Sequence, residues 1–229
     1  MSMSIIERNS YKVSQDLPFN FNMFIKGKNN KYIYNSLIKT NILNNSFIDV
    51  LDDCICFTAE TVEPLNDFLF KDNRNTKLTN IESIQLLKTI TRQIKYLECS
   101  KNYTFYGFNI DDILVINKTR YIIVSSEHIK HIQDKEMIFN NPLKIPYFSS
   151  PEILKLTNLP SKIHSNSCYY SLGALVVYCL LNENLLVGNE IKNDKELEVL
   201  LEEIYDTNIY WFLKRCLHQD VKKRVLLLV

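Results

Sequence analysis

The sequence predicts an α+β fold in which a short β-rich segment precedes a larger, mostly helical part. Short apolar runs rich in β-branched and aromatic residues, such as FIDVL and CICFT, occur between residues 23 and 58. From residue 65 onward, apolar residues recur at spacings of three and four, the period of an amphipathic helix. We therefore divide the chain into residues 1–60 and residues 61–229.

The composition predicts a folded protein of the reducing intracellular environment, either cytoplasmic or nuclear. Of the 229 residues 46% are hydrophobic, and 27 basic and 26 acidic side chains give a net charge of +1. This balance gives no electrostatic reason to expect a nucleic-acid partner. The N-terminus lacks the apolar run of a signal peptide, and no segment approaches the ~18 apolar residues that span a bilayer. We expect no membrane association.

The cysteines and histidines do not form a recognisable metal or disulfide framework. The six cysteines have no regular spacing. Cys54 and Cys56 would share one face of a strand, but no second pair of ligands accompanies them, so a buried-core role is favoured over a metal site. The histidines also lack ligand partners and are expected at the surface: His128, His131, His164 and His218. We predict no metal and no cofactor.

The small part is expected to contain strands within Met23–Ile33 and Ser46–Thr58. A long helix follows, capped by Thr79 or Asn80 with Glu82 in its first turn. Its apolar face is formed by residues at spacings of three and four: Ile81, Ile84, Leu87, Ile90, Ile94 and Leu97.

Beyond this helix, the runs 113–116 and 121–124 around the sequence NKTR predict a β-hairpin. The pattern then becomes irregular as far as residue 151. Residues 171–181 are almost wholly apolar, which predicts a helix inside the core. Residues 194–204 and 205–217 predict two amphipathic helices.

Three motifs in this order resemble the protein-kinase family. The sequence IPYFSSPE at 145–152 is similar to the end of a kinase activation segment. YSLGA at 170–174 with YCLL at 178–181 resembles the family's central helix, and CL at 216–217 with Asp220 and Arg224 resembles a later motif. The resemblance covers roughly Ile25 to Arg224. It implies a bilobal kinase-like fold with a small, reduced β-rich N-lobe at 1–60 and a mostly helical C-lobe at 61–229.

The resemblance also implies a structural ion pair. Glu152 and Arg224 match the carboxylate and the guanidinium that connect the family's activation segment to the helices beneath it. Such a pair is bidentate and buried, so its role is in packing.

The catalytic loop of the family is not preserved. Phosphoryl transfer requires an aspartate that orients the attacking hydroxyl, groups that hold magnesium, and a loop over the phosphates. The matching stretch reads FYGFNIDD at 105–112, which aligns Gly107 with the catalytic aspartate, Asn109 with the lysine and Asp112 with the metal-binding asparagine. The catalytic base is therefore missing.

The metal-binding turn and the glycine-rich loop are missing as well. Where the family has Asp-Phe-Gly, this sequence reads Ser125, Ser126 and Glu127. The chain has four glycines in total, and only Gly27 precedes the hinge region, so no loop can bring several backbone amides close to a phosphate. We predict that the protein is not an enzyme.

Two remnants of a polar site remain. Lys26 is a candidate for the nucleotide-binding lysine, but Ser36 lies near the position of its glutamate partner, so a solvated lysine is favoured. Asp111 and Asp112 could hold a divalent ion, although a turn or cap role is favoured for them.

The resulting expectation is a catalytically inactive pseudokinase. It would act as a protein-binding scaffold or regulator whose partner is either an active kinase or the substrate of one. The alternative is an atypical phosphotransferase, or a nucleotide-binding kinase-like protein, that uses Asp111 and Asp112 together with Glu127 and Lys26.

Overall fold

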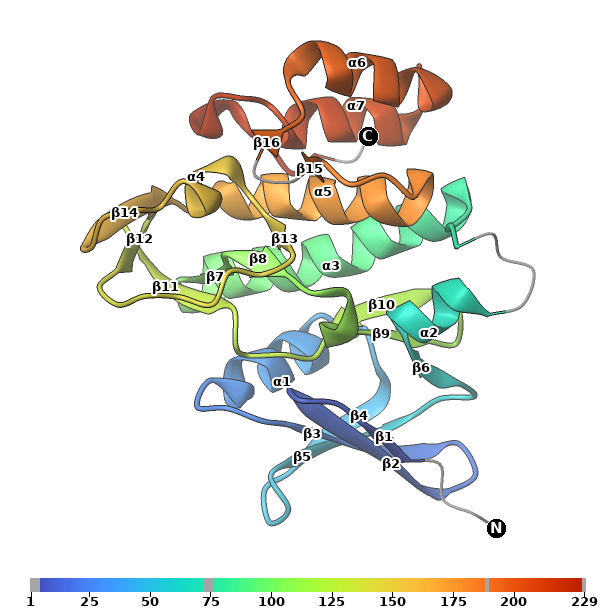
Figure 1. Cartoon of the computed structure of the whole chain (residues 1–229). Coiled ribbons are helices and arrows are strands. Elements are labelled where there is room, and N and C mark those ends of the chain that lie inside the picture. Colours follow the sequence, from blue (N-terminus) through green and yellow to red (C-terminus); the bar gives the residue numbers. More distant parts are fainter. Residues whose placement is uncertain (1–4, 72–75, 188–189, 228–229) are drawn as a thin grey trace.

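The computed structural model describes residues 5–71, 76–187 and 190–227. It has a mixed α+β fold with several antiparallel sheets. An N-terminal sheet occupies one end of the molecule, two long helices cross its middle, and two shorter helices lie at the far end (Figure 1).

The N-terminal sheet is five-stranded and antiparallel, with the strand order β1-β2-β3-β5-β4. Helix α1 lies between β3 and β4 in the sequence. Apolar residues alternate along the strands and face inward, as Val13 on β2 and Met23 on β3 do. The elements are β1 (Ile5–Glu7), β2 (Tyr11–Leu17), β3 (Asn20–Ile25), α1 (Asn30–Lys39), β4 (Asn44–Asp49) and β5 (Cys54–Thr58).

The strand prediction for Met23–Ile33 is wrong in its second half. Strand β3 ends at Ile25, Gly27 adopts a positive φ of 108°, and Ile33 lies in helix α1. The buried residues Ile33 and Leu37 are four apart and form the inner face of this helix. The short apolar run around residue 33 contains too few positions to distinguish the two periods.

The long helix and the hairpin of the sequence analysis are confirmed, but the prediction of Ile81 on the apolar face of the helix is wrong: it lies in the first turn and is 70% exposed. Thr79 caps α3 and forms a capping box with Glu82, in which each side chain accepts from the other residue's backbone N–H. Asn102 ends this helix in the left-handed conformation. The hairpin joins β6 in a three-stranded sheet. The elements are β6 (Val62–Pro64), α2 (Leu65–Phe70), α3 (Asn80–Lys101), β9 (Ile113–Ile116) and β10 (Arg120–Ile123).

The stretch expected to be irregular contains strands instead. Residues 129–139 form a hairpin whose turn residues, Asp134 and Lys135, both have positive φ. This hairpin pairs with strands distant in the sequence, which no local pattern indicates. The strands here are β7 (Tyr103–Phe105), β8 (Gly107–Phe108), β11 (Ile129–Gln133), β12 (Glu136–Phe139), β13 (Phe148–Ser149) and β14 (Ser161–His164).

Helix α5 forms the centre of the core, as its apolar sequence predicts. Its residues are almost all buried, and it packs beside α3 (Figure 1). None of the helices in the described part of the chain combines the length and the apolar character needed to cross a bilayer. The remaining elements are α4 (Pro151–Leu154), α5 (Ser167–Leu181), β15 (Leu186–Val187), β16 (Glu190–Ile191), α6 (Asp194–Leu201) and α7 (Asn208–Cys216), with 3-10 turns at Ile110–Asp112, Glu202–Ile204 and Val221–Lys223.

Candidate functional site

Glu152 and Arg224 form a bidentate ion pair. Arg224 donates from Nη1 to Glu152 Oε2 at 2.9 Å and from Nη2 to Oε1 at 2.8 Å. The arginine side chain is fully buried, donates from Nε to the His218 carbonyl, and lies over the ring of Tyr170. Burial acts to raise the pKa of Glu152, but the hydrogen bond and charge of Arg224 outweigh it, so the pKa is lowered. The pair joins the start of α4 to the C-terminal segment.

Gly107 has no room for a side chain. It lies on β8, which pairs with β13, and a Cβ placed on it would lie 2.6 Å from Pro146 Cγ and 2.9 Å from the Phe148 carbonyl oxygen. Real Cβ atoms do not approach other atoms this closely. The segment around Pro146 therefore covers the place where an aspartate at position 107 would project.

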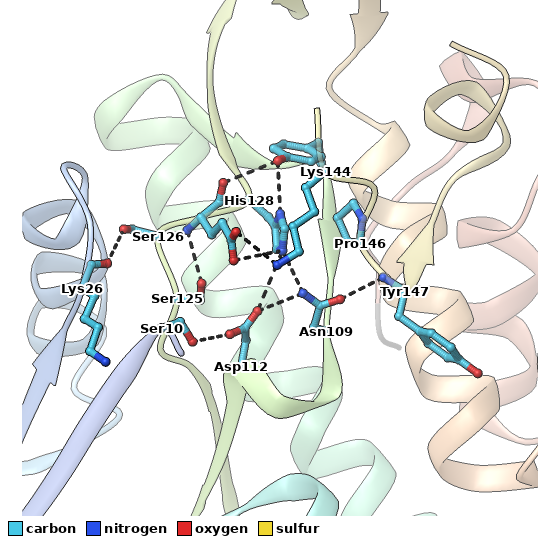
Figure 2. Close-up of polar contacts among 12 residues, drawn as sticks. Ser10, Lys26, Asn109, Asp112, Ser125, Ser126, His128, Lys144, Pro146 and Tyr147 are labelled. Carbon is cyan, nitrogen blue, oxygen red and sulfur yellow. Dashed lines mark hydrogen bonds and ion pairs between the residues drawn. The ribbon is translucent and has the colours of Figure 1, made fainter. Parts of the chain in front are cut away.

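Asp112 connects the N-terminal sheet to the rest of the molecule. It is buried, at 8% exposure, and accepts hydrogen bonds from Ser10 Oγ and, at 3.2 Å, from Asn109 Nδ2 (Figure 2). Ser10 lies in the turn between β1 and β2, whereas Asp112 lies just before β9. This buried hydrogen bond joins side chains 102 positions apart and thus connects the N-terminal sheet to the rest of the molecule.

His128 extends this contact into a chain of hydrogen bonds. The backbone N–H of Tyr147 donates to Asn109 Oδ1 at 2.9 Å, which orients the amide so that its Nδ2 donates to His128 Nε2 at 2.8 Å. The ring proton of neutral His128 is then on Nδ1, which donates to Tyr106 Oη at 3.1 Å. Tyr106 donates onward to the carbonyl of Glu127 (Figure 2).

The prediction that His128 lies on the surface is wrong. Its exposure is 3%, because Tyr106 and Asn109 enclose its ring. Burial lowers the pKa of His128, although the carboxylates of Asp112 and Glu127, each 3.9 Å from Nε2, act to raise it. The ring is therefore neutral, in agreement with the hydrogen bond that its Nε2 accepts.

Of Ser125, Ser126 and Glu127, Ser126 makes a second contact with the N-terminal part, at the residue that follows β3. Ser126 Oγ donates to the Lys26 carbonyl at 3.0 Å. A Cβ on Gly27 would lie 2.6 Å from the Ser126 hydroxyl oxygen. The close approach of Ser126 therefore depends on glycine at position 27. Ser125 is buried and accepts from the backbone N–H of Glu127.

The Lys26 ammonium is half-exposed and points along the β1 side of the sheet. It donates to the Arg8 carbonyl at 3.3 Å and lies 3.7 Å from the Glu7 carboxylate. Ser36 on α1 donates to the Ile33 carbonyl and accepts from Gln93 on α3. Lys26 and Ser36 therefore have separate partners.

Tyr11 is a residue of this region that the sequence analysis missed. It is fully buried, and its hydroxyl has no hydrogen-bond partner among the described residues. It follows Ser10 in the chain; burial raises the pKa of its phenol, and the charge of Arg8 acts to lower it. In the sequence, Tyr11 and Val13 alternate with polar residues, and this pattern could have indicated that Tyr11 lies on the inward face of a strand.

A cleft of about 500 Å³ lies beside this network. Four carboxylates and two basic side chains line it, and both cations are engaged: Arg8 with Asp67 at 2.9 Å and Lys144 with Glu127 at 3.4 Å. The lining residues are Glu7, Arg8, Asn9, Ser10, Asn109, Ile110, Asp111, Asp112, Glu127, Lys144 and Tyr147.

The two adjacent aspartates of the sequence analysis differ in environment. Asp111 is exposed, while Asp112 is buried and hydrogen-bonded. Across the described residues, no three His, Cys, Asp or Glu side chains gather as a metal ion would require. Cys54 and Cys56 share a face of β5 with their sulfurs 3.9 Å apart, and burial raises the pKa of Cys54 to about 12, so its thiol is neutral.

Comparison with known proteins adds no assignment, since no protein-family model and no curated protein matches the chain.

Proposed function

We propose that this chain is a kinase-like protein without phosphotransferase activity that acts by binding a protein partner. The order of the elements supports the kinase-like part of this proposal. A five-stranded antiparallel sheet with one helix between its third and fourth strands precedes a mostly helical part, and the change occurs near residue 60. The Glu152–Arg224 pair agrees with the motifs on which the resemblance depends.

The hydrogen-bond network around Asp112 is the observation that carries the inactive part of the proposal. In an active kinase, the residue at this position holds a metal ion. Here one oxygen of Asp112 accepts from Ser10 and the other accepts from Asn109, and His128 adjoins them. Both Asp112 oxygens, which a metal ion at this position would require, are thus engaged by protein side chains.

The charge of the cleft also disfavours nucleotide binding. The cleft is lined by more carboxylates than cations, and its cations already have acidic partners, so a triphosphate would meet unfavourable charge.

The alternative, a phosphotransferase centred on Asp111 and Asp112, has weaker support. It would require Asp112 to exchange its bonds with Ser10 and Asn109 for a metal ion. It would also need a base in place of Gly107, where Pro146 leaves no space for a Cβ.

A thermal-shift titration with ATP and magnesium tests the proposal. A ligand present at 100 times its Kd adds about 2.7 kcal/mol of stability, which corresponds to a rise of about 5–10 °C in Tm for a chain of this size. We expect no rise. The Ser10→Ala variant, which frees one oxygen of Asp112, serves as a matched comparison. A magnesium-dependent rise in the unaltered protein would overturn the proposal.

A further inference from the structure

Helices α6 and α7 lie at the end of the molecule opposite the N-terminal sheet (Figure 1). These helices and the turn between them carry exposed apolar side chains. Val199, Tyr205 and Trp211 are 68%, 66% and 44% exposed. The inner faces of the same helices are already packed in the core through Leu201 and Phe212. The exposed residues are therefore not needed for the helices to pack. We call this surface, at residues 198–211, the α6–α7 face.

The aromatic residues of the α6–α7 face form a connected group. The ring centroids of Tyr205 and Tyr210 lie 5.1 Å apart, and those of Tyr210 and Trp211 lie 5.0 Å apart. The Trp211 indole donates to the Asp206 carboxylate at 3.3 Å. These contacts hold the rings in place at the surface, which reduces the entropy cost of binding through them.

The charge of this region differs sharply from that of the whole chain. Residues 194–206 contain six carboxylates and one lysine, whereas the chain as a whole has a net charge of +1. Glu198 is paired with Lys214 at 2.9 Å. Glu202 and Glu203 are exposed, directly precede the aromatic group, and form no ion pair with any described residue. The exposed rings thus lie beside uncompensated negative charge.

We propose that the α6–α7 face binds a basic amphipathic segment of a partner protein. The apolar side of such a segment would cover Tyr205 and Trp211, residue types that are enriched among the anchors of protein interfaces. Its lysines or arginines would lie against Glu202 and Glu203, since opposite charge steers association and selects the partner. The same carboxylates repel anionic lipid and nucleic acid. This inference depends on the proposed protein-binding function and names the class of partner.

The chain provides its own probe for this binding. Trp211 is its only tryptophan, so any change in tryptophan emission reports on the α6–α7 face. The test ligand is a synthetic peptide of leucine and lysine arranged at helical spacing, and its control has glutamate at every lysine position. We expect the lysine peptide to shift and saturate the Trp211 emission and the glutamate peptide to leave it unchanged.

Charge reversal distinguishes a specific face from general electrostatic attraction. The Glu202→Lys, Glu203→Lys variant should raise the Kd of the lysine peptide by about tenfold or more. The matched control, Asp52→Lys with Glu60→Lys, changes the net charge equally at exposed positions in the N-terminal part and should retain the affinity. A third variant, Tyr205→Ala, should weaken binding without changing the charge. Circular dichroism and Tm confirm that each variant is folded.

Several outcomes would overturn the inference: no emission change with the lysine peptide, equal binding of the glutamate peptide, or equal weakening by the two charge reversals. Each would reject the α6–α7 face while leaving the inactive kinase-like proposal intact. Stabilisation by ATP and magnesium would reject that proposal whatever the peptide does.

Discussion

Two polar clusters, each with a buried member, have different roles in this molecule. The Glu152–Arg224 pair is charged and joins elements within the helical part, α4 and the C-terminal segment. The cluster of Ser10, Asp112 and His128 joins the N-terminal sheet to the rest of the chain and includes a histidine that is neutral. The first cluster stabilises one packed unit. The second closes the junction between two, at the place where the proposed fold would otherwise bind a nucleotide.

The largest effect is expected from breaking the first cluster. Glu152→Ala leaves a fully buried guanidinium without its carboxylate, which should lower the free energy of unfolding by about 3–5 kcal/mol. Urea denaturation measures the loss. In the control variant, Glu136→Ala, the lost ion pair with Lys162 is exposed, and its cost should stay below about 1 kcal/mol. Equal losses in the two variants would contradict this prediction, because the Glu152–Arg224 pair would then contribute no more to stability than an exposed ion pair does.

A smaller effect is expected at the junction. Ser10→Ala removes one hydrogen bond to a buried carboxylate and should cost about 1.5–3 kcal/mol. The loss should be accompanied by faster amide hydrogen exchange in β1 and β2 relative to α5, because the contact holds the N-terminal sheet against the rest of the molecule. Ser161→Ala, which removes an exposed hydroxyl with a local backbone partner, is the control. Unchanged exchange in β1 would contradict a fastening role for Ser10.

The smallest effect is expected in the pH dependence of the free energy of unfolding. Because the pKa of folded His128 is lowered from its ordinary value of 6.5, the unfolded chain takes up a proton more readily, and stability falls as the pH drops below about 6.5. The slope from this group cannot exceed about 1.4 kcal/mol per pH unit. His128→Gln should flatten the slope of unfolding free energy between about pH 7 and about pH 5.5.

A control is needed because burial also lowers the pKa of His164, which acts in the same direction. His164→Gln should leave the His128 contribution in place. If the slope persists in His128→Gln and disappears in His164→Gln, the neutral state of His128 is not what the junction depends on.

Local sequence signals predicted much of the fold but little of the junction. The capping pair Thr79 and Glu82 lies within one turn, and the apolar run of α5 is continuous, so both helices could be read from neighbouring residues. The burial of His128 depends instead on Tyr106 and Asn109, which are around 20 positions away in the sequence. No window of adjacent residues contains that information.

The candidate site likewise has features that the sequence could suggest and features that it could not. The expectation that Gly107 and Ser125 stand where the kinase family has its catalytic aspartate and its metal-binding turn depends on the resemblance alone, in which each is a single position at fixed spacing. That Ser10 would bond to Asp112, and that Pro146 would cover Gly107, follow from the tertiary approach of separate segments. Motif spacing leads to an expectation of which residue stands at each position, but not of the contacts that this residue makes.

The contact between Ser10 and Asp112 also constrains the order in which the protein can be assembled on the ribosome. The N-terminal sheet is built from one uninterrupted stretch, residues 5–58, and all its strand partners are available before Asp112 is synthesised. Domains of nascent chains generally fold in N-to-C order. The sheet can therefore form first, while Ser10 in the β1–β2 turn does not yet contact Asp112. Joining it to the rest of the molecule is then a later step of biogenesis, and a nascent chain that does not yet include Asp112 cannot complete it.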